Sequence, residues 1–196
     1  MNAQQQQRRT GIAAITLATI LSFGTMSGCA PSLITLQVQA LPEGASAPIR
    51  LELDGLLHSG DQYRLEVHVP RPAYVYVMQP GNPQPKTLFP QQAGQDNRAT
   101  PTAPFYVPSL EQFMALDNQV GTERLIVVVT VQPLSTEALH KFVKEQDEMT
   151  SRGTDPPPGT IGPTGKDPTR YVVKGAFDAQ QRAILRFSFQ HERPQS

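Results

Sequence analysis

Short stretches of alternating apolar and polar residues, separated by prolines and glycines, restrict the fold of this chain more than any other feature. The clearest stretch spans 62–69 and places its apolar side chains on one face: Tyr63, Leu65, Val67 and Val69. A period of two is typical of a β-strand with one buried face. The 19 prolines and 14 glycines among 196 residues favour many turns and little long helix. We therefore predict a mainly β fold.

Similar stretches elsewhere predict many short strands. Residues 73–78 are apolar on both faces, which indicates a strand that is covered on both sides. Residues 123–131 contain the strongest β-branched run, which we expect in the middle of the core. Residues 171–177 and 183–190 flank a polar turn and predict a hairpin. A short helical turn is expected at 110–116. Short strands at close spacing favour an antiparallel β-sandwich. The remaining expected strands cover 33–40, 49–53, 86–89 and 105–107.

One short amphipathic helix is expected, because apolar residues recur at helical spacing between Leu139 and Met149. Ser135 or Thr136 can act as its N-cap. The segment 150–169 that follows contains five prolines and four glycines. This composition cannot bury enough apolar surface to offset chain entropy, so we expect a flexible Pro/Gly-rich loop.

The first 28 residues have the layout of a secretory signal peptide. Two arginines precede an apolar run at 11–23, and small residues then lead to Cys29. As a helix the run would span about 20 Å, short of the ~30 Å hydrocarbon core of a bilayer, so a permanent transmembrane helix is not predicted. We expect residues 1–28 to be removed, 29–32 to form a lipidated tether and 33–196 to form the folded domain.

Cys29 is the only cysteine, so no disulfide within the chain is expected. The residues Met26-Ser27-Gly28-Cys29 resemble the lipobox of bacterial lipoproteins, with Met26 where leucine is usual. The resemblance implies that the Cys29 sulfur carries diacylglycerol, with acyl chains such as palmitate that anchor the protein to the membrane. Ala30 stands where an aspartate would imply retention at the inner membrane, so an outer-membrane lipoprotein facing the periplasm is expected. The alternative is an incidental cysteine beside an ordinary cleavage site.

Four short motifs follow one another in the middle of the chain. They are Gly60-Asp61 before a strand, Tyr74-Val75-Tyr76-Val77 within one, Leu88-Phe89-Pro90 at the end of the next, and Gly121-Thr122-Glu123 before an apolar strand. This order resembles the bacterial domain of unknown function 4384 over roughly residues 48–134, with Ala73 where that family usually has glycine. The resemblance implies an Ig-like β domain with an accessory or binding role in the cell envelope, and no established catalytic residues.

Composition and motif spacing give no support for nucleic-acid binding, catalysis or a metal. The 17 basic and 17 acidic residues cancel, which argues against the basic surface that nucleic-acid binding needs. The four histidines lack the spacing of metal ligands, and the carboxylates Glu111, Asp117 and Glu123 are scattered. A glycine-rich segment ending at Lys166 lacks the residue pattern of a phosphate-binding loop. We expect no catalytic residue, metal or cofactor.

Two pairs of side chains are candidates for contact with a partner. Tyr74 and Tyr76 point the same way along their strand and are candidates for a shallow aromatic groove, although core packing with hydrogen-bonded hydroxyls is favoured. Leu88 and Phe89 lie at an expected strand edge, where packing is again favoured over strand addition. We predict a lipid-anchored, non-catalytic adaptor that binds another envelope protein. The alternatives are a small-ligand sensor and an envelope hydrolase whose site is assembled only in three dimensions.

Overall fold

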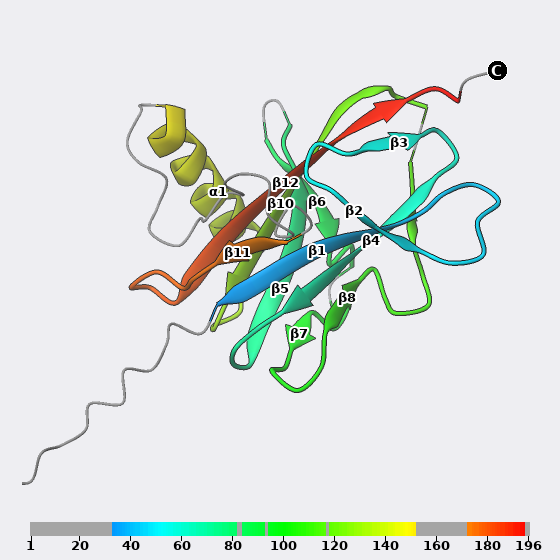
Figure 1. Cartoon of the computed structure of the whole chain (residues 1–196). Coiled ribbons are helices and arrows are strands. Elements are labelled where there is room, and N and C mark those ends of the chain that lie inside the picture. The colour runs from blue at the N-terminus through cyan, green and yellow to red at the C-terminus, as the bar shows by residue number, and fades with distance from the viewer. Residues whose placement is uncertain (1–32, 82–83, 93, 117, 152–171, 195–196) are drawn as a thin grey trace, which may run out of the picture. The chain divides into compact units, whose positions relative to one another are not determined.

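The computed structural model contains two six-stranded β-sheets and one helix (Figure 1). The chain divides into two compact units, 1–30 and 31–196, and only the second contains described residues. The predicted signal peptide, Cys29 and the tether therefore lie outside the described residues, as does the expected loop beyond Ser151. The structure describes residues 33–81, 84–92, 94–116, 118–151 and 172–194.

The first sheet is built around strands β1 and β4, which pair in antiparallel register with Gln39 opposite Arg64. Its main strand order is β11-β1-β4-β8, with β2 also paired to β1 and β9 also paired to β4. The strands are β1 (Ile34–Leu41), β2 (Ile49–Leu51), β4 (Gln62–His68), β8 (Phe105–Val107), β9 (Met114–Ala115) and β11 (Val173–Gly175).

The second sheet is built around strand β10, which pairs with β12 on one edge and β5 on the other. Its main order is β3-β12-β10-β5-β6, with β7 also paired to β5. The described pairings are antiparallel in both sheets, except that β3 runs parallel to β12. The strands are β3 (Leu56–His58), β5 (Ala73–Gln79), β6 (Lys86–Phe89), β7 (Arg98–Ala99), β10 (Gly121–Thr130) and β12 (Arg182–Glu192).

The main hydrophobic core lies between the two sheets, because every second residue of the long strands points inward. Aromatic rings join the sheets: Tyr63 of β4 meets Phe189 of β12 with ring centroids 5.3 Å apart, and Phe105 of β8 meets Phe89 of β6 at 5.8 Å. The prediction of a mainly β chain is confirmed. The central members of this core are Leu36, Val38, Leu65, Val67, Val75, Val77, Leu125, Val127, Leu185 and Phe187.

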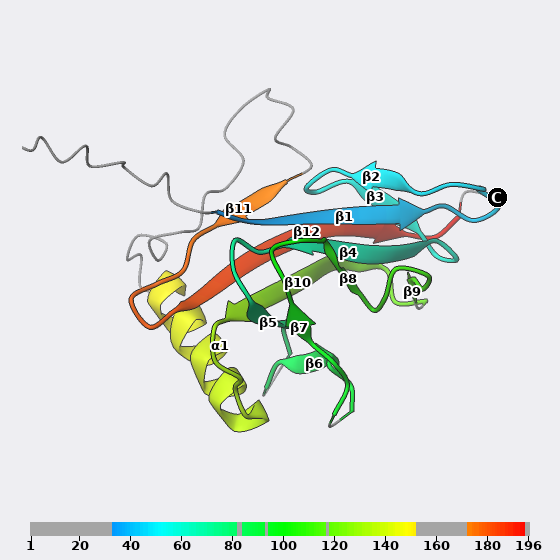
Figure 2. The same cartoon turned by 90° about the horizontal axis from the view of Figure 1, so that it is seen from below.

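Helix α1 (Thr136–Ser151) covers the outer face of the second sheet (Figure 2). The Ala138 N–H donates to Ser135 Oγ at 3.2 Å, so Ser135 is the N-cap, and the expected helix is confirmed. The side chains of β5, β10 and β12 that point away from the main core form a second core with the helix. This second core contains Tyr76, Met78, Ile126, Val128, Leu139, Phe142, Val143 and Ile184.

Two expectations about local structure are wrong. Residues 110–116 form no helical turn, because Met114 and Ala115 pair with β4 as strand β9. Residues 173–175 and 182–192 form no hairpin, because β11 pairs with β1 in the first sheet while β12 joins the second. The expected turn is present, with the Gln181 N–H donating to Asp178 O at 3.0 Å, but it carries the chain from one sheet to the other.

Replacement of Phe142 tests whether the second core stabilises the domain. Phe142 is 4% exposed, so Phe142→Ala should lower the free energy of unfolding by about 3–5 kcal/mol, through lost burial and a residual cavity. Lys141→Ala, at the neighbouring exposed position, should change it by no more than about 0.5 kcal/mol. Urea denaturation followed by circular dichroism measures both values, and similar values for the two variants would contradict a stabilising second core.

Candidate functional site

Tyr76 lies beneath the start of helix α1 rather than in an open groove. Its side chain belongs to the second core, and the residue is 5% exposed. Its hydroxyl oxygen accepts a hydrogen bond from the Leu134 N–H at 2.7 Å. Tyr74 is partly buried against the same cluster. The two tyrosines share a face as the sequence predicted, but that face packs against the helix and its connection.

Leu88 and Phe89 also serve packing. Phe89 is 2% exposed and lies in the main core against Phe105, while Leu88 packs partly against the same core. The structure places this pair in β6, on the edge of β5 opposite β10, and does not bring it together with Tyr74 and Tyr76 into one exposed surface. Core packing, the alternative favoured from the sequence, accounts for Tyr76 and Phe89, while a binding role for the β6 edge stays a prediction.

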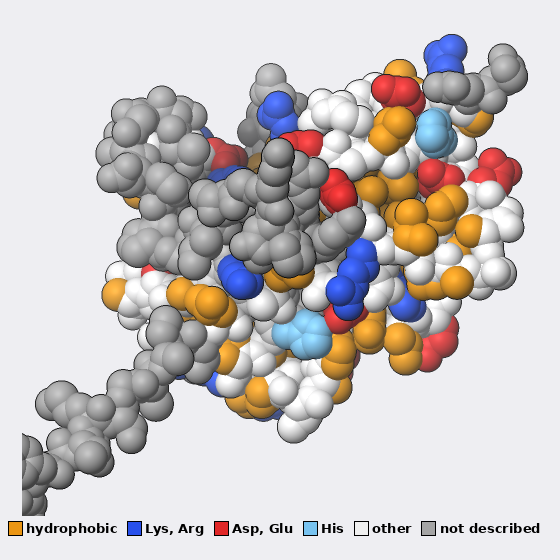
Figure 3. All heavy atoms as spheres, viewed as in Figure 1, with side chains coloured by type: hydrophobic (Ala, Val, Ile, Leu, Met, Phe, Trp, Pro, Cys, Tyr) orange, Lys and Arg blue, Asp and Glu red, His pale blue; other side chains and the backbone are white. Residues whose placement is uncertain are grey.

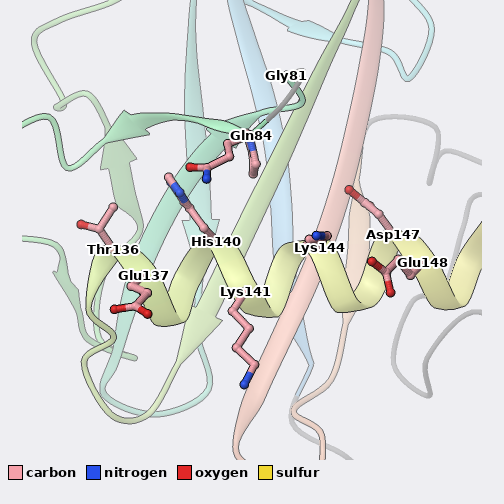
Figure 4. Close-up of a pocket in the computed structure, with 10 residues that line it drawn as sticks. Gly81, Gln84, Thr136, Glu137, His140, Lys141, Lys144, Asp147 and Glu148 are labelled. Carbon is pink, nitrogen blue, oxygen red and sulfur yellow. The ribbon is translucent and has the colours of Figure 1, made fainter.

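An open groove runs between α1 and the loop around Gly81 and Gln84 (Figure 4). Its volume is about 1080 Å³. His140 points toward Gln84, while Lys141 points the other way. His140 Nε2 lies 3.3 Å from Thr87 Oγ1 of β6, so the histidine also helps to hold the helix against this strand. The groove carries charges of both signs along the helix: Glu137, Lys141, Lys144, Asp147 and Glu148.

A serine, a histidine and a glutamate that are far apart in the sequence meet where β3, β10 and β12 come together. Ser59 Oγ lies 3.0 Å from His191 Nε2, and Glu123 Oε1 lies 3.7 Å from His191 Nδ1. These residue types form the triads of many hydrolases. Sequence reasoning missed the cluster because only strand pairing brings its members together. The pairing of β10 with β12 places Glu123 near His191, and the pairing of β3 with β12 places Ser59 beside it.

The geometry of this cluster fits a structural role better than a catalytic one. The distance from Glu123 to His191 Nδ1 exceeds hydrogen-bond length, and this nitrogen has no hydrogen-bond partner among the described residues. No carboxylate of the described residues therefore lies within hydrogen-bonding distance to orient the imidazole, as the third residue of a catalytic triad does. The Ser59 N–H donates to Glu192 O at 2.9 Å. Ser59 and His191 thus fasten the turn at 58–61 to the end of β12.

The outer face of the first sheet carries an ordered group of polar and aromatic side chains. We call it the Arg64 face, and it comprises Gln39, Arg64, Glu66, His68, Tyr106 and Phe113. The Arg64 guanidinium carbon lies 4.8 Å from the centroid of the Tyr106 ring and 4.6 Å from that of Phe113. These contacts are cation-π interactions, which hold the long side chain in one place.

Hydrogen bonds order the same face. Arg64 donates through Nε to Gln39 Oε1 at 2.8 Å and through Nη1 to the Leu110 carbonyl oxygen. Glu66 accepts from Gln39 Nε2 at 2.5 Å and lies 2.7 Å from His68 Nε2. The alternation in 62–69 places Arg64, Glu66 and His68 on the outward face, but Tyr106 and Phe113 reach it only through the pairing of β8 and the fold of the next loop.

Other observations apply to the described part of the chain only. No group of three metal-ligating side chains occurs there, and no helix there is long and apolar enough to cross a membrane. Acidic, basic and hydrophobic side chains are interspersed on the face displayed in Figure 3. Comparisons of the chain with family models, with curated proteins and with solved structures found no match.

Removal of one hydroxyl group tests the role of Tyr76. Tyr76→Phe leaves the Leu134 N–H without its acceptor, so the free energy of unfolding should fall by about 1–3 kcal/mol. Tyr74→Phe is the matched control on the same face of β5 and should have a smaller effect, because the Tyr74 ring is only partly buried. Thermal and urea denaturation of both variants measure the difference, and equal losses would contradict a specific role for the Tyr76 hydroxyl.

Proposed function

We propose that this chain is a lipid-anchored, non-catalytic binding module of the bacterial cell envelope, which holds a partner protein near the outer membrane. The observation that carries the proposal is the Arg64 face, where a guanidinium contacts two aromatic rings and two hydrogen-bond acceptors on the outer side of a sheet. Arginine and aromatic residues are enriched where protein partners bind most strongly. A side chain that is already ordered loses less entropy when a partner binds.

The anchoring part of the proposal rests on the sequence Met26-Ser27-Gly28-Cys29. A thioether at Cys29 accounts for a single cysteine placed directly after an apolar run, and several acyl chains anchor a protein stably without a spanning helix. Ala30 supports an outer-membrane location facing the periplasm. An Ig-like arrangement of the sandwich and kinship with domain of unknown function 4384 are further parts of the proposal, supported by the order of motifs from Gly60 to Glu123.

A test of the anchor compares Cys29→Ala with Ser27→Ala in the full-length protein. Cys29→Ala should abolish incorporation of labelled palmitate and shift the protein from the outer-membrane fraction to the soluble periplasmic fraction, because no sulfur remains to be acylated. Ser27→Ala keeps a small residue before the cysteine and should behave like the unchanged protein. Palmitate labelling and sucrose-gradient fractionation give the two readouts. A Cys29→Ala protein that stays in the membrane would contradict the anchor.

A second candidate function is an envelope hydrolase, and the observation that favours it is the 3.0 Å contact of Ser59 with His191. We propose instead that Ser59 is not a nucleophile, since Glu123 lies 3.7 Å from His191 Nδ1 and does not orient the imidazole through a hydrogen bond. A fluorophosphonate probe, which labels activated serines, should therefore leave Ser59 unmodified under conditions that label a known serine hydrolase. Mass spectrometry locates any adduct, and a probe adduct on Ser59 that disappears in His191→Gln would establish the hydrolase alternative.

A further inference from the structure

The charge of Arg64 lacks a direct counter-ion within the described residues. The ion pairs found there include other arginines, such as Arg182 with Asp178 and Arg186 with Asp147, but not Arg64. The nearest outward-facing acidic side chain of the same strand, Glu66, is engaged by Gln39 and His68. Among the described residues, Arg64 is thus held by contacts with two rings and by two neutral acceptors, with no carboxylate against its guanidinium.

The surroundings of Arg64 restrict the chemistry of a group that could bind its guanidinium. Leu110, whose carbonyl oxygen binds Arg64, is 53% exposed and offers an apolar contact directly beside the guanidinium. Glu66 is the acidic residue of the same face, and it is already engaged by Gln39 and His68. A single arginine suits one carboxylate, and it disfavours a dianionic phosphate or an anionic bilayer, which need clusters of positive charge.

The rings of Tyr106 and Phe113 also bear on the type of partner. Each ring already has one face against the guanidinium, so neither offers two free faces for a ligand to enter between. The rings instead stiffen the cation, and its Nη2, which donates to no described residue, can give a charge-assisted hydrogen bond to a carboxylate. This arrangement suits an acidic side chain on a protein segment better than a sugar ring, whose recognition uses open aromatic faces.

We infer that the Arg64 face binds a partner protein through a segment that presents a glutamate or aspartate carboxylate beside an apolar residue. The inference rests on the proposed binding function and names the chemistry of its partner. The carboxylate accepts a hydrogen bond from Arg64 Nη2, and the apolar residue covers the Leu110 side chain. No covalent step takes place.

Immobilised peptides test the inference with full-length protein in detergent micelles. The probes are peptides with a central Glu-Leu pair and otherwise identical peptides with Gln-Leu. The glutamate peptides should bind about tenfold more tightly, the difference that one charge-assisted pair provides. Arg64→Gln should remove this preference. Arg124→Gln removes a charge from an exposed position on β10 and should preserve it. Equal binding of the two peptides, or a preference that survives Arg64→Gln, would overturn the inference.

Two further probes separate this inference from the general proposal. The first is a pair of non-protein ligands, anionic phospholipid vesicles and a soluble acidic polysaccharide, and neither should bind in a way that depends on Arg64. Arg64-dependent binding to either ligand, without binding to the peptides, would refute a protein partner. A photo-crosslinking residue at Leu110 should give a protein adduct in cells that Arg64→Gln abolishes, while one at Val120, also exposed, should not. An adduct at Val120 alone would be consistent with a binding module that contacts its partner elsewhere, but it would overturn the role of Arg64.

Discussion

Strand β10 pairs with β12 along its length and with β5 over Ile126–Thr130, and its residues 125–130 are buried on both faces. The rest of the domain is arranged around this part of the strand. Leu125, Val127 and Val129 point into the core between the sheets, while Ile126 and Val128 point toward helix α1. A strand in this position cannot shift its register by one residue without exchanging the two buried faces. Its pairing therefore holds β5 and β12 in register and places the helix.

The helix has a direct consequence for recognition. Because α1 covers the outer face of the second sheet, the tyrosines of β5 are used for packing, and Tyr76 also supplies an acceptor for the chain entering the helix. The outer face of the first sheet carries ordered polar side chains instead, with Arg64 held against Tyr106 and Phe113. The outer faces of the two sheets thus differ because the helix covers only the second one.

The chain carries 17 basic and 17 acidic residues, and removal of the proposed signal peptide with Arg8 and Arg9 would leave 15 and 17. A chain with so little net charge exerts little long-range attraction on a charged partner, so specificity in the proposed recognition would come from individual side chains at short range. In the proposed binding role, Arg64 would meet that requirement because ring contacts and hydrogen bonds already hold its side chain. A lipid anchor would complement such a face by raising the local concentration of the domain at the membrane.

Periodicity in the sequence was enough to predict the long strands and the capped helix, because alternation at period two or at helical spacing reflects which side of one element is buried. It could not predict that residues 173–175 join β1, that Met114 and Ala115 pair with β4, or that Ser59 meets His191, since these contacts link distant segments. The sequence alone determined the alternating faces and the single cysteine at the end of an apolar run. Only the tertiary structure decided which aromatic side chains became core and which arginine came to lie half-buried against Tyr106 and Phe113, because burial depends on what packs against a face.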